Sequence, residues 1–230
     1  MTVQENVNSD AILQTREHLA YIGRMMFERN LTDSAGGNIS VRVGNLVVMS
    51  PSLAGQKRQW QINTEDVLVV DFERNVLVGD GLITRETNVH LALHQNFSDY
   101  GTAVIHSHAR NLMVFAAMAK PMPAVLEANR KFGDTPVVEY APAHSPKLGE
   151  NIVASMRGRE QRIAKHAAGS IAPWHGLFLM GKDLDAAFDA VERFDTNAYC
   201  IIMGQNLGAS PAFEKEQAHM EEVIGGYSEE

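Results

Sequence analysis

A short apolar run that ends in two histidines, residues 103–108 (AVIHSH), constrains this chain more than any other stretch. If the run is a β-strand, its side chains alternate between two faces, so His106 and His108 point to the same side. Two imidazoles on one face can share a single divalent ion. A sheet edge at which two histidines meet solvent is an equally open interpretation, because a complete metal site needs three or four ligands.

Length and composition indicate one domain over residues 1–230, with loose tails at 1–9 and about 222–230. The net charge of −8, without a basic tract, argues against a nucleic-acid partner. No apolar run reaches the length of a membrane helix, and the polar start lacks a signal-peptide core. The single cysteine, Cys200, is expected to be a buried small hydrophobe and fits a reducing cytoplasm, where we expect the protein to act.

The N-terminal half alternates helical and strand-like patterns. Apolar residues recur at helical spacing from Asp10, whereas apolar and polar residues alternate over 39–43, which predicts a half-exposed strand. Gly44-Asn45 is a hairpin-forming turn, and 46–49 is the return strand. The remaining predicted elements are strands at 66–72 and 76–78 and a helix at 86–97, which leads into the histidine strand.

The C-terminal half continues this mixture. Ser145-Pro146 is a good start for a helix, with a capping residue and a proline at the first position. The other predicted elements are helices at 111–119 and 184–203, strands at 137–140 and 171–181, and an amphipathic helix in the tail. Strands and helices do not alternate strictly, and one hairpin is clear. We therefore predict an α/β fold with a mixed, largely antiparallel central sheet flanked by helices.

His175 is the natural third ligand. It lies in an apolar setting, where an unpaired imidazole would be costly to bury, and Gly176 lets the backbone bend so that the ring faces a neighbouring strand. A core histidine bonded to a backbone carbonyl is the alternative. Three histidines with one open position are typical of a catalytic zinc site, where the ion can polarise a substrate oxygen.

Glu86 is the best candidate for an acid or base, because it opens the helix that leads into the histidine strand. An acidic residue in a first helical turn also complements the helix dipole, and the local sequence alone favours that role. Similarly, the amides of Gly36 and Gly37 could hold an anion, or the pair could form a plain turn.

Four motifs, taken in order, resemble the class II aldolase/adducin family, typified by L-fuculose-1-phosphate aldolase and L-ribulose-5-phosphate 4-epimerase. The resemblance covers roughly residues 10–205 and rests on 37–42 (GNISVR), 86–90 (ETNVH), 106–108 (HSH) and 175–177 (HGL). It implies a three-layer α/β/α fold and a cyclic homotetramer with active sites at the subunit interfaces.

The resemblance also implies a mechanism. His106, His108 and His175 would bind a divalent metal, usually zinc, with manganese or cobalt as alternatives, and Glu86 would be the acid/base that can also ligate the metal before substrate arrives. The family's aldolases cleave a ketose phosphate reversibly, while the metal stabilises an enediolate and the glutamate moves the proton.

The anion pocket departs from the family pattern. Gly37, Asn38 and Ser52 fit a phosphate site, but Ala35 and Leu53 replace a usual threonine and glycine, and Thr84-Arg85 replaces a serine pair. Arg85 could hold a phosphate or a carboxylate, or face solvent. The family's interfacial tyrosine has no clear match, and Tyr140 and Tyr227 are unsupported substitutes.

Three hypotheses follow. The first is aldol cleavage of a ketose phosphate or a related hydroxy-carbonyl compound. The second uses the same metal for epimerisation of a sugar phosphate or decarboxylation of a keto acid. The third is a non-catalytic scaffold like the adducin head, against which the complete set of three histidines and Glu86 argues.

Overall fold

The computed structural model describes residues 7–205, 207 and 213–226, and within this part of the chain seven strands form one sheet. The strand order is β4-β3-β2-β1-β5-β7-β6, and each pair of neighbouring strands is antiparallel. The strands are β1 (Asn38–Val43), β2 (Leu46–Met49), β3 (Leu68–Val70), β4 (Val76–Val78), β5 (Ala103–Ser107), β6 (Ala167–Ala172) and β7 (Gly176–Gly181). The predicted antiparallel sheet is therefore confirmed.

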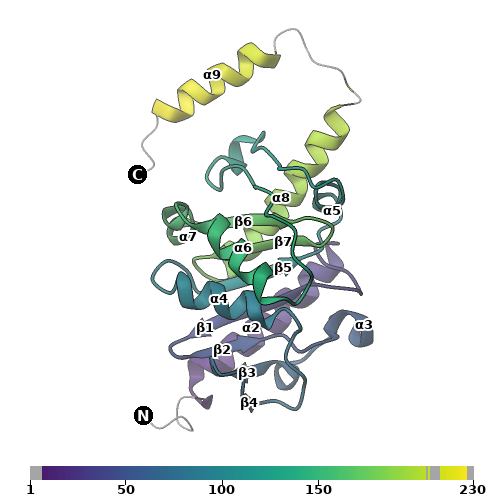
Figure 1. Cartoon of the computed structure of the whole chain (residues 1–230), viewed down its shortest axis with the longest axis vertical. Coiled ribbons are helices and arrows are strands. Elements are labelled where there is room, and N and C mark those ends of the chain that lie inside the picture. The colour runs from purple at the N-terminus through teal and green to yellow at the C-terminus, as the bar shows by residue number, and fades with distance from the viewer. Residues whose placement is uncertain (1–6, 206, 208–212, 227–230) are drawn as a thin grey trace.

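Helices cover both faces of this sheet and complete three layers (Figure 1). The α-helices are α2 (Asp10–Glu28), α3 (Ala54–Arg58), α4 (Thr87–Asn96), α5 (Leu112–Ala117), α6 (Pro146–Met156), α7 (Glu160–Lys165), α8 (Leu184–Gly204) and α9 (Phe213–Gly226). Two short 3-10 helices, Thr64–Asp66 and Glu127–Asn129, lie in loops of the described part of the chain. Apolar residues of α2, α5 and α8 pack on one face, and those of α4, α6 and α7 pack on the other.

The longer helices begin where the sequence offers a side-chain cap. The hydroxyl of Ser9 accepts from the amide of Ile12 at the start of α2, and the hydroxyl of Ser145 accepts from Leu148 at the start of α6. These bonds satisfy amides that have no partner within the helix. The hairpin between β1 and β2 turns at Gly44, whose φ of 60° is one that glycine adopts without steric cost.

Three predicted elements need correction. The 171–181 segment is not one strand, because β6 and β7 meet in a tight turn that contains Trp174 in a left-handed conformation. Residues 137–140 form no strand and make only an isolated bridge from Val137 to Ile171. Strand β1 is not half-exposed, since α4 covers its second face and fully buries Ser40.

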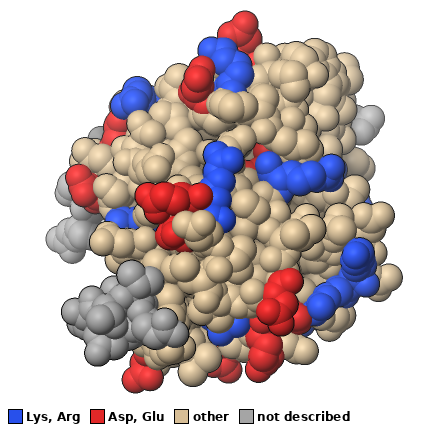
Figure 2. Space-filling model, turned by 60° about the horizontal axis from the view of Figure 1, so that its bottom comes forward, with Lys and Arg blue, Asp and Glu red and all other residues tan. Residues whose placement is uncertain are grey.

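Smaller differences concern the C-terminal region. Cys200 is half-buried on α8 rather than fully buried. Helix α9 continues to Gly226, so the end predicted to be loose from about residue 222 is partly helical, and the residues after 226 and before Val7 lie outside the described part. None of the described helices combines the length and the apolar character needed to cross a membrane. Positive and negative side chains are interspersed on the face in Figure 2.

Candidate active site

The structure gathers all the predicted site residues around one cavity of about 230 Å³. These nine residues are Gly37, Asn38, Ser52, Thr84, Arg85, Glu86, His106, His108 and His175. They come from segments that are far apart in the sequence, and the sheet order explains how they meet. Strand β5 lies between β1 and β7, so the end of β5 is flanked by the start of β1 and the start of β7.

The three histidines converge at this end of β5. His106 is the buried fourth residue of the strand, His108 follows its last residue, and His175 occupies the turn before β7. One ligand nitrogen from each ring lies within 4.8 Å of the others. The separation suits three ligands around a single ion.

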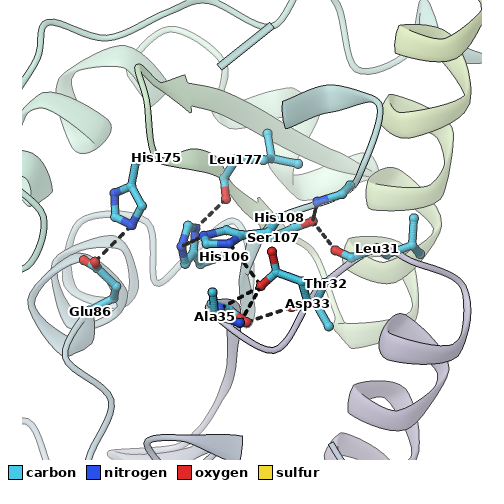
Figure 3. A network of polar contacts seen from close by, with 12 residues as sticks. Leu31, Thr32, Asp33, Ala35, Glu86, His106, Ser107, His108, His175 and Leu177 are labelled. Carbon is cyan, nitrogen blue, oxygen red and sulfur yellow. Dashed lines mark hydrogen bonds and ion pairs between the residues drawn. The ribbon is translucent and has the colours of Figure 1, made fainter. Parts of the chain in front are cut away.

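Polar contacts of the two Nδ1 atoms, a hydrogen bond for His106 and an ion-pair contact for His108, leave the Nε2 atoms of these rings facing each other. Nδ1 of His106 donates to the carbonyl of Leu177 at 2.9 Å, and Nδ1 of His108 lies 3.3 Å from the Asp33 carboxylate (Figure 3). The two Nε2 atoms face each other at 3.1 Å, and both are unprotonated when each neutral ring carries its proton on Nδ1. Two lone pairs at this distance repel unless a cation lies between them, so the donor set fits a divalent ion.

The loop before β1 fixes His108 from outside. Asp33 Oδ1 also accepts from the amides of Ala35 and Gly36, each at 2.8 Å, which shapes the loop as a tight turn. A Cβ atom on Gly36 would lie 2.0 Å from Cε1 of His108, so only glycine fits there. The sequence reasoning missed Asp33, although an aspartate two residues before a small-residue turn was a usable signal.

Gly176 packs closely against the rings of His106 and His108, so a larger residue would not fit there. Its φ is 153°, and a Cβ atom there would lie 2.7 Å from the carbonyl oxygen of Ser107 and 3.0 Å from the His108 ring. The predicted bend after His175 is therefore present, and it is a turn between two strands rather than a kink within one.

Glu86 lies at the start of α4 with its carboxylate against His175. Its Oε1 atom is 3.3 Å from His175 Nε2, and the side chain is 3% exposed (Figure 3). Burial raises the pKa of Glu86 to about 7, while the His144 amide and the positive charge of Arg85 oppose this effect. Neither carboxylate oxygen makes a hydrogen bond of normal geometry within the described chain. Such a group is suited to exchange a proton near neutral pH.

His144 also lines the cavity, and the sequence reasoning missed it. Its Nδ1 atom is 2.9 Å from Glu86 Oε1, and its backbone is left-handed, with a φ of 68°. The side chain of Asn88, in the first turn of α4, donates to the His144 carbonyl at 2.9 Å and holds the loop. Burial and the nearby Arg85 charge lower the pKa of His144. The local sequence around His144 carries no periodic pattern that would have marked it.

The opposite wall of the cavity is rich in amides and small residues. Gly37 has a φ of 88°, and a Cβ there would lie 2.0 Å from Thr32 Oγ1. Ser52 and Gly55 line the cavity beside it, and Leu53 holds a left-handed conformation with a φ of 63°. That conformation explains why glycine is usual at this position in the family that the sequence resembles.

Arg85 supplies a positive charge at the cavity wall. It is exposed, lines the cavity, and is close enough to Glu86 and His144 to influence the pKa of both. Thr84 beside it is buried, and its hydroxyl faces the Glu86 amide at 3.4 Å. The cavity thus combines three convergent imidazoles, a buried carboxylate and a wall suited to an anion.

Residues 17–202 match the family described as Class II Aldolase and Adducin N-terminal domain. An L-fuculose phosphate aldolase of Methanococcus maripaludis (strain C5) is 30% identical over 190 residues, which cover 81% of this chain and 95% of that protein. An L-ribulose-5-phosphate 4-epimerase UlaF of Salmonella paratyphi A is 30% identical over 188 residues, which cover 76% of this chain and 79% of that protein. A solved structure of an L-fuculose 1-phosphate aldolase has a TM-score of 0.74 at 28% identity, and the match covers 94% of this chain and 97% of that one.

This chain belongs to the class II aldolase/adducin family. The resemblance stated from the four motifs is confirmed, together with the three-layer fold that it implies. The family is typically dependent on a divalent metal, and the histidine cluster of this chain could bind one.

Proposed function

We propose that this protein is a divalent-metal-dependent lyase that reversibly cleaves a carbon–carbon bond of a ketose phosphate or a related hydroxy-carbonyl compound. The observation that carries the proposal is the position of Glu86, whose buried carboxylate lies 3.3 Å from one member of a three-histidine cluster. A scaffold without catalytic activity would gain nothing from burying a carboxylate there, because burial destabilises the charged form.

His106, His108 and His175 would hold the ion, with zinc as the first choice and manganese or cobalt as alternatives. When bound, a divalent ion there supplies a fixed positive charge for a carbonyl oxygen at which negative charge develops. The backbone carbonyl of Leu177 and the carboxylate of Asp33 orient two of the rings.

Glu86 would transfer the proton at carbon. In the cleavage direction a substrate hydroxyl loses its proton to solvent water, the adjacent carbon–carbon bond breaks, and the electron pair passes to the carbon beside the carbonyl. That carbon then accepts a proton, which we assign to Glu86, and the reverse reaction returns it. The raised pKa of Glu86, about 7, keeps both of its protonation states accessible near neutral pH.

The opposite wall would bind the phosphate. Gly37, Asn38, Ser52 and Thr84 offer amide, carboxamide and hydroxyl donors around the cavity, and Arg85 offers a guanidinium. An anion held there would place the reacting carbons between this wall and the histidines.

L-fuculose 1-phosphate is the first substrate to test, because the aldolase relatives are named for it. Release of dihydroxyacetone phosphate from the zinc-loaded protein, followed by coupled reduction, should depend on the metal and stop when it is chelated. The proposal fails if the metal-loaded protein cleaves neither this compound nor any of a panel of ketose 1-phosphates.

Two observations favour a second reaction on the same site. One relative is a ribulose-phosphate epimerase, and Arg85 is an exposed guanidinium at the cavity that could hold a carboxylate for decarboxylation. Turnover of L-ribulose 5-phosphate, or release of carbon dioxide from a keto acid, without cleavage of ketose 1-phosphates would favour this alternative.

We further propose a homotetramer with active sites at the interfaces. Large apolar side chains are exposed around the turn that carries His175. Trp174 is 65% exposed and contacts Tyr140, which is 58% exposed, and Met118, just after α5, is 60% exposed; the amide of Trp174 donates to the carbonyl of Ala116 in α5. Burying these residues against a second copy would remove apolar surface from water. Light scattering after gel filtration should give four chains, and a monomer would contradict the proposal. The cytoplasmic location expected from the lone cysteine stays a prediction.

A further inference from the structure

A chain of buried hydrogen bonds runs from the cavity into the layer between the sheet and α4. Asn38 lines the cavity, and its Oδ1 atom lies 2.5 Å from Nε2 of His90. Nδ1 of the same ring lies 2.6 Å from the hydroxyl of Ser40, which lies 2.8 Å from Nε2 of His94. Ser40, His90 and His94 are fully buried, and the proposed reaction uses none of them.

Secondary structure places these side chains together. Asn38 and Ser40 are two residues apart on β1, so they point to the same face of the sheet, toward α4. His90 and His94 are four residues apart on α4, so they point to the same side of that helix. Each histidine therefore faces β1, and the serine between them joins the two rings.

Two proton arrangements for neutral rings satisfy all three bonds and also use the hydroxyl hydrogen of Ser40. If Ser40 instead accepted from both rings, its buried hydroxyl hydrogen would have no acceptor among these bonds, which is costly. In the first arrangement His94 Nε2–H donates to Ser40, Ser40 donates to His90 Nδ1, and His90 Nε2–H donates to Asn38 Oδ1. In the second, every bond is reversed, and the carboxamide of Asn38 is turned over so that its NH₂ group donates to His90.

The end of the hydrogen-bond chain at His94 distinguishes the two arrangements. Nδ1 of His94 is buried and has no hydrogen-bond partner in the described chain. The first arrangement leaves an unprotonated acceptor there, whereas the second leaves a buried N–H donor. Orphaned N–H donors are the rarer case in proteins, so the first arrangement is favoured. Burial also lowers the pKa of His90 to about 3 and lowers that of His94, so both rings stay neutral.

We propose that His94 and Ser40 are positioning residues that act through His90 to fix the carboxamide of Asn38, with its NH₂ group directed to the cavity. The cavity wall then presents a donor, and never an acceptor, to an anionic oxygen of the substrate. Without this chain of hydrogen bonds, the carboxamide of Asn38 could turn over and present its oxygen to the cavity, and that oxygen would repel an anion. The inference deepens the proposed function and rests on it, because Asn38 lines the proposed phosphate site.

The proton arrangement can be measured directly, whether or not the enzyme turns over a known substrate. Long-range proton–nitrogen correlation spectra of the ¹⁵N-histidine-labelled protein distinguish protonated from unprotonated ring nitrogens. We expect His90 and His94 both to be neutral Nε2–H tautomers between pH 6 and 8, a range that brackets neutrality, with His94 assigned from the signal lost in His94→Gln. An Nδ1–H tautomer at either histidine would overturn the proposal.

A pair of variants tests the consequence for binding. His94→Gln keeps an amide donor at the same number of bonds from the backbone, whereas His94→Met keeps similar length without a donor. Inorganic phosphate binding to the metal-loaded protein, measured by calorimetry, should weaken about tenfold in His94→Met and stay near the wild-type value in His94→Gln. Metal content should be equal in both variants, and KM should rise in His94→Met with little change in kcat.

Equal phosphate affinity of the two variants would overturn the proposal, because a purely structural role of His94 would not depend on the donor. Failure of the wild-type protein to bind phosphate would also overturn it, and would leave the metal site of the proposed function untouched. In contrast, phosphate binding with the expected difference between glutamine and methionine, in a protein that cleaves no ketose phosphate, would support the positioning role and contradict only the proposed reaction. If His94→Met does not fold, the tautomers of the wild-type protein decide the question.

Discussion

The Nε2 atoms of His106 and His108 face each other at 3.1 Å, and Nδ1 of each ring is directed to an oxygen. When the proton of each ring lies on Nδ1, the two Nε2 lone pairs face each other. This relationship is unfavourable in an empty site and favourable around a cation. A preformed pair of this kind lowers the conformational entropy that binding must overcome, since both rings are already oriented.

Removal of one ligand should release the metal. His108→Ala leaves two histidines, and we expect elemental analysis to fall from about one metal per chain to near zero, with the fold largely kept. His18→Ala is a matched control, because His18 pairs with Asp185 on the surface, 2.7 Å away. Full metal occupancy in His108→Ala would contradict the ligand assignment.

Gly36→Ala should weaken metal binding without changing a ligand. The added Cβ would lie 2.0 Å from the His108 ring, so the ring or the loop must move. We expect about 10–100-fold lower zinc affinity, measured by competition with a chromophoric chelator. Gly204→Ala, near the end of α8 where a Cβ meets nothing within 4 Å, is the control. Unchanged affinity in Gly36→Ala would show that the loop adjusts freely.

Glu86→Gln should slow turnover while the metal is retained. The carboxamide keeps the shape of the side chain but cannot exchange the proton, so we expect kcat to fall by about 10²–10⁴-fold. The rate of ketose-phosphate cleavage by metal-loaded protein measures this effect, with the exposed Glu150→Gln on α6 as the control. Wild-type turnover in Glu86→Gln would remove this residue from the mechanism.

Acid should destabilise the metal-free protein through the buried histidines. The pKa of His90 is lowered by burial to about 3, and that of His94 is lowered by burial and by the proximity of His90 and Arg42. An unfolded histidine titrates near pH 6.5, so below that pH the unfolded state binds protons that the folded state does not. The stabilising effect of the neutral rings is therefore present above about pH 6.5 and is lost as the pH falls.

The free energy of urea unfolding of the metal-free protein, measured at about pH 7.5, 6 and 5, would show this loss. These pH values lie on both sides of the pKa of an unfolded histidine. In His94→Gln the slope of unfolding free energy against pH should be shallower by up to about 1.4 kcal/mol per pH unit, the value for one proton. Identical slopes in the two proteins would mean that His94 is protonated in the folded state.

Local sequence determined much of the framework of this protein. The hairpin over β1 and β2 follows from alternation and a Gly44-Asn45 turn, and the start of α6 follows from Ser145 and Pro146, because these signals act over a few residues. Short local patterns also pointed to His106, His108 and Glu86 as candidate site residues. The family was identified from the order of the four motifs. All the predicted site residues lie at one cavity, although their roles stay predictions.

Only the tertiary structure decided which side chains contact those residues. His144 reaches Glu86 and Asp33 reaches His108 from loops without a periodic pattern, and the two faces of β1 are both buried because α4 packs over Ser40. Periodicity reports which side of an element is apolar, but it does not report which partner a polar side chain meets across 50 residues of sequence, as Ser40 meets His90. Such partners are fixed by sheet order and helix packing, which are long-range properties of the whole chain.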